Sequence, residues 1–287
     1  MPQLADNAHC TGCMCCADSC KQGAITIAED KNGLWHPVVD AQKCTNCHLC
    51  EKRCQEVCNG TFLQRNPINS YVPYTAWNKN QDQRNLSTSG GVFAALASTI
   101  LDKGGVICGA EINNNRVKHI CISSPEELPR IQGAKYIQSY SQGIYQQVRT
   151  HLEAQQTVLF TGTPCQVAAL YSYLGKNKSK KNFYTAEVIC HGVVSNLILD
   201  KHLEYNHADQ IVSFRTKNLG WGKDTYTTAI KQGEKVVLKN RHKNFFYHAF
   251  TSDTVTRLSC YQCQYASIER VADLTMGDYW GNKQAKE

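Results

Sequence analysis

The sequence of 287 residues predicts an α+β protein made of two domains, on three observations. Two cysteine runs of identical spacing lie within residues 10–54, and between them two alternating apolar segments flank an Asn-Gly turn. From residue 68 onwards, short apolar segments typical of strands alternate with segments of helical period. We therefore expect a small cysteine-rich module over residues 1–67 and a mixed α/β domain over residues 68–287.

The two cysteine runs share the spacing CxxCxxCxxxC. In bacterial-type ferredoxins such a run supplies three ligands to one 4Fe–4S cluster, and its fourth cysteine binds the other cluster. The runs therefore predict a dicluster 4Fe–4S ferredoxin module with crossed ligands. The expected ligands are Cys10, Cys13, Cys16 and Cys54 for the first cluster, and Cys44, Cys47, Cys50 and Cys20 for the second. The runs depart from the bacterial pattern at Lys21 and Gln55, where proline is usual.

A disulfide framework and a pair of zinc sites are the alternatives for this module. Disulfides suit secreted chains, whereas the opening MPQLADNAHC has neither a basic segment nor an apolar segment of a secretion signal. Structural zinc sites usually take their ligands in pairs rather than in a run of three plus one. Both alternatives are weaker than iron-sulfur clusters, and metal analysis separates them.

Composition limits the class of protein. The formal charge is +7, but each oxidised four-thiolate cluster carries about two negative charges, so the charge indicates no nucleic-acid partner. The longest apolar stretch, residues 92–101, is too short to cross a bilayer. Sixteen cysteines without a secretion signal indicate reduced thiols that serve as metal ligands. We expect a soluble, cytoplasmic protein.

The secondary structure follows from apolar periodicity and from turn residues. Residues 24–30 and 34–40 are expected to form a hairpin, and residues after Cys58 a linker. Further strands are expected over residues 74–78, 105–112, 117–122, 157–160, 183–192, 211–217, 225–230 and 235–239. Helices are expected over residues 92–105, 142–154, 166–174 and 195–206.

Six cysteines lie beyond the first module, and four of them could form one further ligand set: Cys165, Cys190, Cys260 and Cys263. Cys165 begins a predicted helix, where a thiolate is favoured. Their separations in sequence impose no geometry, so spacing alone leaves open whether they converge, and a structural zinc is the simpler alternative. Cys108 and Cys121 lie on apolar strands, and we expect them to be buried thiols of the core.

The segment STSGG, residues 87–91, precedes a predicted helix and is a candidate phosphate-binding loop. Its glycines and hydroxyl groups equally suit an ordinary helix start, so the pattern alone does not decide. Lys135, Arg215 and Lys217 are cations that could neutralise phosphates or a reduced, anionic flavin. Solvated surface positions are the alternative for them.

Seven motifs in order resemble one known family: STSGG, GAKYIQS, VLFTGTPCQVAAL, VICHGVVS, FRTKNLGW, CYQCQYA and ADLTMGDYWG. From about residue 70 to residue 281 the chain is similar to the beta-subunit family of coenzyme F-420 hydrogenases and dehydrogenases, with the ferredoxin module placed in front. The resemblance implies a flavin-binding α/β domain that holds FAD. It also implies a third 4Fe–4S cluster at the four cysteines of the GTPCQ, CHG and CxxC motifs.

The resemblance further implies a flavin site. Ser89, Gly90 and Gly91 would line the flavin phosphates, and Lys135, Arg215 and Lys217 would act at the isoalloxazine or the substrate. The other cofactor-binding positions are Tyr136, Gln138, Gly162, Thr163 and Gln166. Two departures matter: Ala134 stands where the family usually has serine, and the chain stops at Glu287, where relatives tend to continue.

These observations predict a flavin-dependent iron-sulfur oxidoreductase. A ferredoxin or another redox protein is the expected partner at the clusters. The substrate at FAD is a small molecule, either a deazaflavin coenzyme or a metabolite of a polysaccharide pathway. An electron-transfer subunit of a larger redox complex, with no substrate of its own, is the alternative. A zinc-containing binding module is a third and weaker hypothesis, and homo-oligomerisation is left open.

Overall fold

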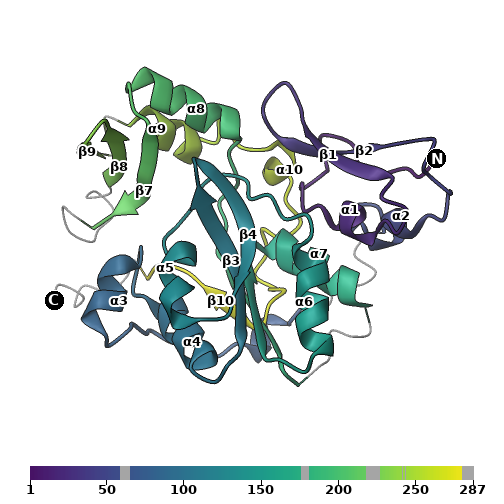
Figure 1. Ribbon diagram of the computed structural model, residues 1–287, viewed down its shortest axis with the longest axis horizontal. Coiled ribbons are helices and arrows are strands. Elements are labelled where there is room, and N and C mark those ends of the chain that lie inside the picture. The colour runs from purple at the N-terminus through teal and green to yellow at the C-terminus, as the bar shows by residue number, and fades with distance from the viewer. Residues whose placement is uncertain (59–64, 176–180, 218–226, 241, 243, 280–287) are drawn as a thin grey trace.

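The computed structural model describes the chain except for residues 59–64, 176–180, 218–226, 241, 243 and 280–287. The described residues form a mixed α/β structure with three sheets, in agreement with the predicted α+β class (Figure 1). Part of the expected linker after Cys58 and the start of the expected strand 225–230 lie outside these residues.

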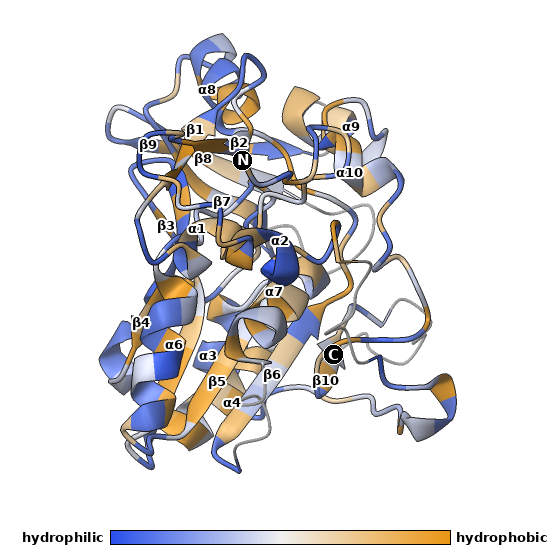
Figure 2. Cartoon of the chain, turned by 90° about the vertical axis from the view of Figure 1, so that its right-hand side faces the viewer, coloured by the Kyte–Doolittle hydropathy of each residue, from blue (hydrophilic) through white to orange (hydrophobic). Residues whose placement is uncertain are grey.

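The N-terminal segment repeats one short pattern around a hairpin. Helix α1 (Cys15–Ser19) and helix α2 (Leu49–Arg53) each follow the first cysteines of a run, and each begins after a residue in left-handed conformation. Between them, β1 (Ile25–Glu29) pairs antiparallel with β2 (Trp35–Val39), which confirms the predicted hairpin. Figure 2 shows α2 as a hydrophilic surface helix.

The central sheet has five strands in the order β10-β6-β5-β3-β4. All neighbours are parallel except the pair of β3 and β4. The strands are β3 (Val106–Asn113), β4 (Arg116–Ile122), β5 (Val158–Gly162), β6 (Phe183–Val188) and β10 (Leu274–Met276). Parallel strands are usually covered on both faces, and this sheet follows that rule.

Alternation along the strands divides the core in two. Val158 and Phe160 of β5 pack with α6 (Ile144–Glu153) and α7 (Pro164–Leu174), whereas Leu159 between them packs with α4 (Val92–Leu101) and α5 (Leu128–Ile131). The cause is the two-residue period of a strand, which sends successive side chains to opposite faces.

A smaller sheet joins β7 (Gln210–Thr216), β8 (Thr227–Gln232) and β9 (Lys235–Asn240) in an antiparallel order. Helix α8 (Asn196–Tyr205) and helix α9 (Phe245–Thr251) pack on it through a separate apolar cluster. The remaining elements are short: α3 (Gln81–Leu86), α10 (Leu258–Tyr261), and 3-10 turns at Ile68–Ser70 and Pro125–Glu127. In the part of the chain that the structure describes, no helix is both long and apolar enough to cross a membrane.

The N-terminal segment packs closely on α6 and α7 (Figure 1). The Asp18 carboxylate accepts hydrogen bonds from the backbone N–H groups of Gly143 (2.6 Å) and Tyr145 (3.2 Å) at the start of α6. The Tyr145 hydroxyl donates to the carbonyl of Cys13 (2.8 Å), and Cys15 is fully buried in the core of the central sheet. The two parts of the chain therefore share an apolar core.

Two expectations are wrong. Residues 74–78 form no strand: their backbone is irregular, and the N–H of Asn78 donates to the carbonyl of Gly90 (2.7 Å) rather than to a neighbouring strand. Cys108 and Cys121 are not separate thiols, because they face each other across β3 and β4 with 4.1 Å between Cα atoms and form a disulfide. Closely opposed residues of an antiparallel pair allow this bridge, and the register that opposes them was not readable beforehand.

Candidate functional site

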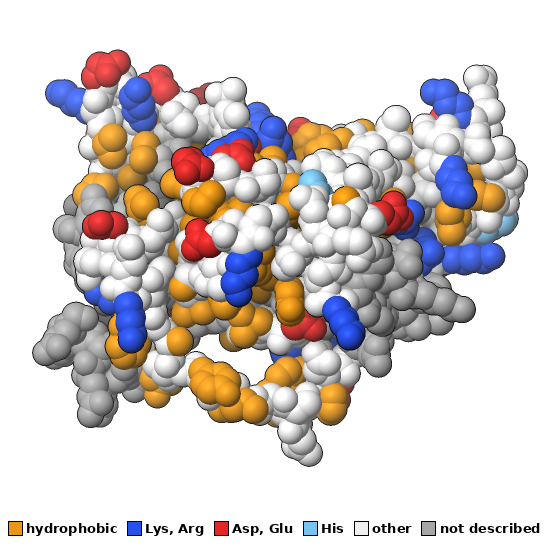
Figure 3. Space-filling view, turned by 60° about the horizontal axis from the view of Figure 1, so that its bottom comes forward, with side chains coloured by type: hydrophobic (Ala, Val, Ile, Leu, Met, Phe, Trp, Pro, Cys, Tyr) orange, Lys and Arg blue, Asp and Glu red, His pale blue; other side chains and the backbone are white. Residues whose placement is uncertain are grey.

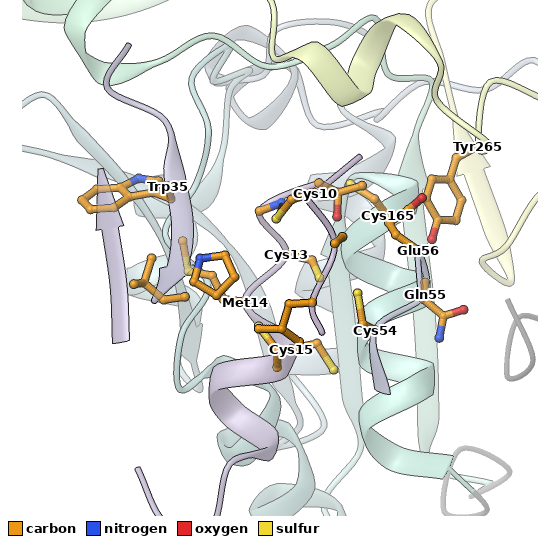
Figure 4. A pocket seen from close by; sticks show the side chains of 17 residues that line it. Cys10, Cys13, Met14, Cys15, Trp35, Cys54, Gln55, Glu56, Cys165 and Tyr265 are labelled. Carbon is orange, nitrogen blue, oxygen red and sulfur yellow. Dashed lines mark hydrogen bonds between the residues drawn. The ribbon is translucent and has the colours of Figure 1, made fainter. Parts of the chain in front are cut away.

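The first candidate site is a pocket under the β1–β2 hairpin. Cys10, Cys13 and Cys16 reach it from the loop before α1 and from α1 itself, and Cys54 reaches it from the end of α2. Figure 4 shows Cys10, Cys13 and Cys54 around the same space. These are the four residues predicted for the first cluster, including the one exchanged from the second run.

The second candidate site is a separate pocket between α1, α2 and the hairpin. Its cysteines are the second predicted set, Cys20, Cys44, Cys47 and Cys50. The crossed arrangement thus brings each predicted set to one pocket, although ligation of a cluster stays a prediction. The backbone explains the crossing: Cys20 directly follows α1 and Cys54 directly follows α2, so each helix separates the last cysteine of a run from the loop that holds the others.

Among the described residues, no three or more His, Cys, Asp or Glu side chains are arranged to hold one metal ion. In a 4Fe–4S cluster each thiolate binds a different iron, so the sulfur atoms surround a space instead of meeting at a point. Apolar side chains line the first pocket, among them Leu4, Ile27 and Trp35, and such a lining limits access of solvent.

Burial favours the protonated form of the thiols in the first pocket. Burial, and after it the neighbouring Cys54, raise the pKa of Cys13 to about 12. Burial likewise raises the pKa of Cys16 well above its usual value. Four thiolates in one apolar pocket would repel each other, so binding of a metal through all four would require its positive charge to draw the protons off.

The third candidate site joins three segments that are distant in sequence. Removal from water raises the pKa of Cys165, and the neighbouring Cys190 and Cys263 raise it further. A Cβ atom added at Gly192 would lie 3.6 Å from the Cβ of Cys260, so the CHG turn lies against the CxxC segment. The structure therefore brings the four cysteines of the third set near one another.

Cys165 also connects the third set to the first. It lies in the first turn of α7, where Thr163 caps the helix together with Gln166. The Thr163 hydroxyl is 3.1 Å from the Cys165 sulfur, and Cys165 lines the same pocket as the first cysteine set. Gly162, directly before Thr163, leaves room for the Gln166 side chain, because a Cβ there would lie 3.0 Å from its Oε1.

Several residues predicted for the flavin site lie close together in the structure. The Lys217 ammonium donates to the carbonyl of Ser89 (2.6 Å) and to that of Arg84 (2.5 Å), at the loop that begins α4. Gly91 adopts a φ of 77° in this loop and directly precedes the helix. The N–H of Ala134 donates to the Thr88 hydroxyl (2.7 Å), which ties the GAKY segment to STSGG.

A further cation, Arg215, lies near Lys217. It is buried, pairs with Asp278 (2.6 Å) and lies beside Tyr136, whose pKa burial raises while Arg215 lowers it. Burial, followed by Arg84 and Arg215, lowers the pKa of Lys217 to about 8. Neighbouring cations, one of them with a lowered pKa, are suited to an anionic ligand.

Other predicted cofactor residues have different neighbours. Gln138 accepts a hydrogen bond from the N–H of Trp35 (3.2 Å) and another from Arg257 (3.1 Å), so its side chain is engaged at the hairpin rather than at the Ser89 loop. The Gln166 amide donates to Ser141 (2.9 Å) beside the third cysteine set. The structure does not bring these two residues to Ser89.

The sequence did not lead us to expect two buried polar residues, Arg257 and His119. Arg257 is 1 % exposed, and His119 is 8 % exposed within β4. A histidine inside the apolar segment VKHICI was a readable signal, because an unpaired polar side chain there is costly. Arg257 stands in no motif, and nothing local indicated its burial.

The structure thus brings the first two predicted cysteine sets to two pockets and the four cysteines of the third set near one another. Residues 155–287 match the family model for the C-terminal part of the beta subunit of coenzyme F420 hydrogenase/dehydrogenase. This match confirms the resemblance and indicates an oxidoreductase with a role in electron transfer.

Among solved structures, a chain of the F420-reducing [NiFe] hydrogenase complex from Methanosarcina barkeri is similar. It is 16% identical with a TM-score of 0.48, and the similarity covers 70% of this chain and 69% of that chain. Similarity at this level says nothing about function. No curated protein matches the sequence.

Proposed function

We propose that the protein is a flavin-dependent iron-sulfur oxidoreductase that passes electrons between a ferredoxin-like partner and a two-electron substrate at FAD. The observation that supports this most directly is the position of Cys165, which lines one pocket together with Cys10, Cys13, Cys16 and Cys54. A cluster held in part by Cys165 would adjoin the cluster of the first set, and short separation favours electron transfer between them.

The residues for each group follow from the sites described above. Residues 1–67 would be the dicluster ferredoxin domain with its linker, and residues 68–287 the FAD and iron-sulfur domain. The twelve cluster ligands would be Cys10, Cys13, Cys16, Cys20, Cys44, Cys47, Cys50, Cys54, Cys165, Cys190, Cys260 and Cys263. A flavin takes up two electrons together and releases them one at a time, which couples a two-electron substrate to one-electron clusters.

The chain's own cations would hold the flavin. Backbone N–H groups at the start of α4 and the ammonium of Lys217 offer donors and charge to phosphate groups. Lys135 donates to the carbonyl of Gln132 (2.7 Å), and burial lowers its pKa to about 8, so an anion beside it would restore its charged form. Arg215 is held in place by Asp278.

Exposed apolar side chains favour the second candidate function, an electron-transfer subunit docked on a larger redox complex. Val72, Tyr74 and Trp77 are 67%, 84% and 61% exposed in one segment. Figure 3 shows hydrophobic side chains at the surface on the side of the molecule that it presents. Exposed apolar patches often mark protein interfaces. A purified protein that turns over a small molecule unaided would reject this alternative.

Metal and flavin content tests the proposal. After anaerobic purification, we expect about twelve irons and twelve sulfides per chain, together with one FAD and no zinc. Cys54→Ser should lose the signal of one cluster in electron paramagnetic resonance. Cys58→Ser is the matched control, because Cys58 lies four residues further on and does not line the pocket. Two zinc ions without flavin would contradict the proposal, and about eight irons without flavin would favour the electron-transfer subunit.

The substrate class needs a separate experiment. If the substrate is a deazaflavin coenzyme, anaerobic mixing with its reduced form should bleach the flavin absorbance within seconds. Lack of bleaching would exclude that coenzyme and direct the search to metabolites of polysaccharide pathways.

A further inference from the structure

Arg257 is the largest side chain that is almost completely buried, at 1 % exposure. It directly precedes α10 and lies three residues before Cys260. Its Nε donates to the carbonyl of Cys10 (2.6 Å), and one terminal nitrogen donates to Oε1 of Gln138 (3.1 Å). The other terminal nitrogen lies 3.2 Å from Nδ1 of His36.

All of these partners are neutral. Burial, and after it the charge of Arg257, lower the pKa of His36, so this imidazole is uncharged beside the guanidinium. The carboxylate of Asp30 lies 3.4 Å from Nε2 of His36. Against the effect of burial, backbone hydrogen bonds, His36 and the charge of Arg257 lower the pKa of Asp30. Within the described part of the chain, no carboxylate forms an ion pair with Arg257. A buried cation without an anion is costly, so its retention calls for a negative charge nearby.

Arg257 lies between two of the proposed cluster sites. Its guanidinium lies at the first cysteine run, because a Cβ atom added at Gly12 would be only 2.9 Å from its Nη1. Its backbone lies at the third set, where the N–H of Cys260 donates to the carbonyl of Arg257 (2.9 Å).

We propose that Arg257 is the buried counter-ion of the clusters bound by the first and third cysteine sets, and that it raises their reduction potentials. The inference rests on the proposed function. An oxidised four-thiolate cluster carries about two negative charges, and the single electron it accepts adds a third without a proton. A fixed positive charge stabilises the reduced form more than the oxidised form. Arg257 thus acts through its fixed positive charge, and it touches no substrate.

Potential measurements on variants separate this role from simple support of the Cys10 loop. Arg257→Gln removes the charge and keeps a donor, Arg257→Lys keeps the charge, and Lys103→Gln removes a charge from an exposed position after α4. Each protein is purified anaerobically, its iron and sulfide are counted, and its clusters are titrated with reductant under electron paramagnetic resonance.

For Arg257→Gln we expect the ratio of reduced to oxidised cluster, at fixed ambient potential, to fall about tenfold at one or both sites. A tenfold change corresponds to a potential lower by about 59 mV for one electron. Arg257→Lys should recover most of this shift, and Lys103→Gln should show none.

Several outcomes would overturn the inference. These are unchanged potentials in Arg257→Gln, an equal shift in Arg257→Lys, or loss of iron in both variants, which would indicate a role in shape alone. Loss of iron in Arg257→Gln with retention in Arg257→Lys supports the role of charge. Wild-type protein without iron would reject the proposed function together with this inference, whereas iron-replete wild type with unresponsive potentials rejects the inference alone.

Discussion

Lys135 shows at the residue scale how a binding site can conflict with stability. Burial lowers the pKa of its ammonium to about 8, and Glu111 opposes this only in part. Because the folded pKa lies below the unfolded value, this group favours folding above the unfolded pKa, and the contribution is lost as pH falls through about 8. At neutral pH the charged side chain therefore destabilises the flavin-free protein.

Lys135→Met should consequently stabilise the flavin-free protein and, under the proposed function, weaken its binding of FAD. We expect a gain of about 1–2 kcal/mol in the free energy of unfolding at pH 7, reduced from the full shift because the side chain is partly screened by solvent. Urea unfolding at pH 7 and pH 10 measures it, and the gain should shrink at the higher pH. Lys103→Met, at an exposed position, is the control. Equal stability of Lys135→Met and wild type at pH 7 would contradict the expectation.

His119 produces a pH dependence of its own. Its Nδ1 is 2.7 Å from the Ser139 hydroxyl, its Nε2 is 3.1 Å from the carbonyl of Thr161, and its ring stacks on Phe160. Burial lowers its pKa to about 4, and Lys135 adds to the shift. The folded pKa lies below the unfolded value of 6.5, so the stabilisation is present above pH 6.5 and is lost as pH falls towards 4.

Wild-type protein should therefore lose about 2 kcal/mol through this group between pH 7 and pH 5. His119→Gln should be less stable at pH 7, but its stability should fall less steeply over the same interval. Guanidinium unfolding at the two pH values measures the difference. Burial also lowers the pKa of His202 to about 4. His202 is present in both proteins, so its contribution cancels in the comparison of their pH profiles. Parallel pH profiles would show that His119 titrates normally.

At the scale of elements, the hairpin is held against α8 by a close approach at its turn. Gly33 adopts a φ of 73°, and a Cβ there would lie 2.7 Å from the Cβ of Leu197 and 3.0 Å from its backbone nitrogen. Gly23 has a similar φ of 60°, but nothing lies within 4 Å of an added Cβ. The two glycines thus differ in packing and share the same backbone requirement.

Gly23→Ala should cost about 1 kcal/mol, the strain of a left-handed alanine. Gly33→Ala should cost about 2 kcal/mol more, because the α8 backbone must move away from the hairpin. Urea unfolding of the two variants gives the comparison directly. Equal losses would mean that the hairpin does not rest on α8 in solution.

At the scale of the whole molecule, residues 1–67 have a small apolar cluster of their own but also pack into the core of the larger part. Cys15 of α1 is buried among residues of α6 and α7, and its sulfur is 3.4 Å from the carbonyl of Ala169. The Ser172 hydroxyl donates to the carbonyl of Arg53 (2.9 Å), which binds α2 to α7. The N-terminal segment therefore covers apolar surface of the central sheet's helices.

Residues 68–287 expressed alone should be destabilised and should expose the apolar surface of α6 and α7. We expect a lower Tm than that of the full chain, binding of a hydrophobic dye, and aggregation. Thermal melts and light scattering on both proteins measure this. A monomeric fragment that melts at the temperature of the full chain would establish two independent domains.

Local patterns in the sequence predicted many of the helices and strands. The hairpin, α4, α6, α7, α8 and strands β3 to β9 were predicted, because alternation and helical period depend on neighbours in sequence. The short helices α1, α2, α3, α5, α9 and α10 and strand β10 were not predicted. Strand β10 has only three residues and exists because it pairs with β6, and residues 74–78 have a strand-like composition but no partner strand in the described part of the chain.

The sequence by itself divided the cysteines of residues 10–54 into the two sets that line separate pockets, since residues on one short loop have their geometry built into their spacing. Only the tertiary structure decided which thiols of the later segments approach each other, that Cys108 faces Cys121, and that Arg257 lies between Cys10 and Cys260. Contacts between distant segments depend on strand register and on the packing of helices. Those are properties of the whole chain, and no short stretch of sequence encodes them.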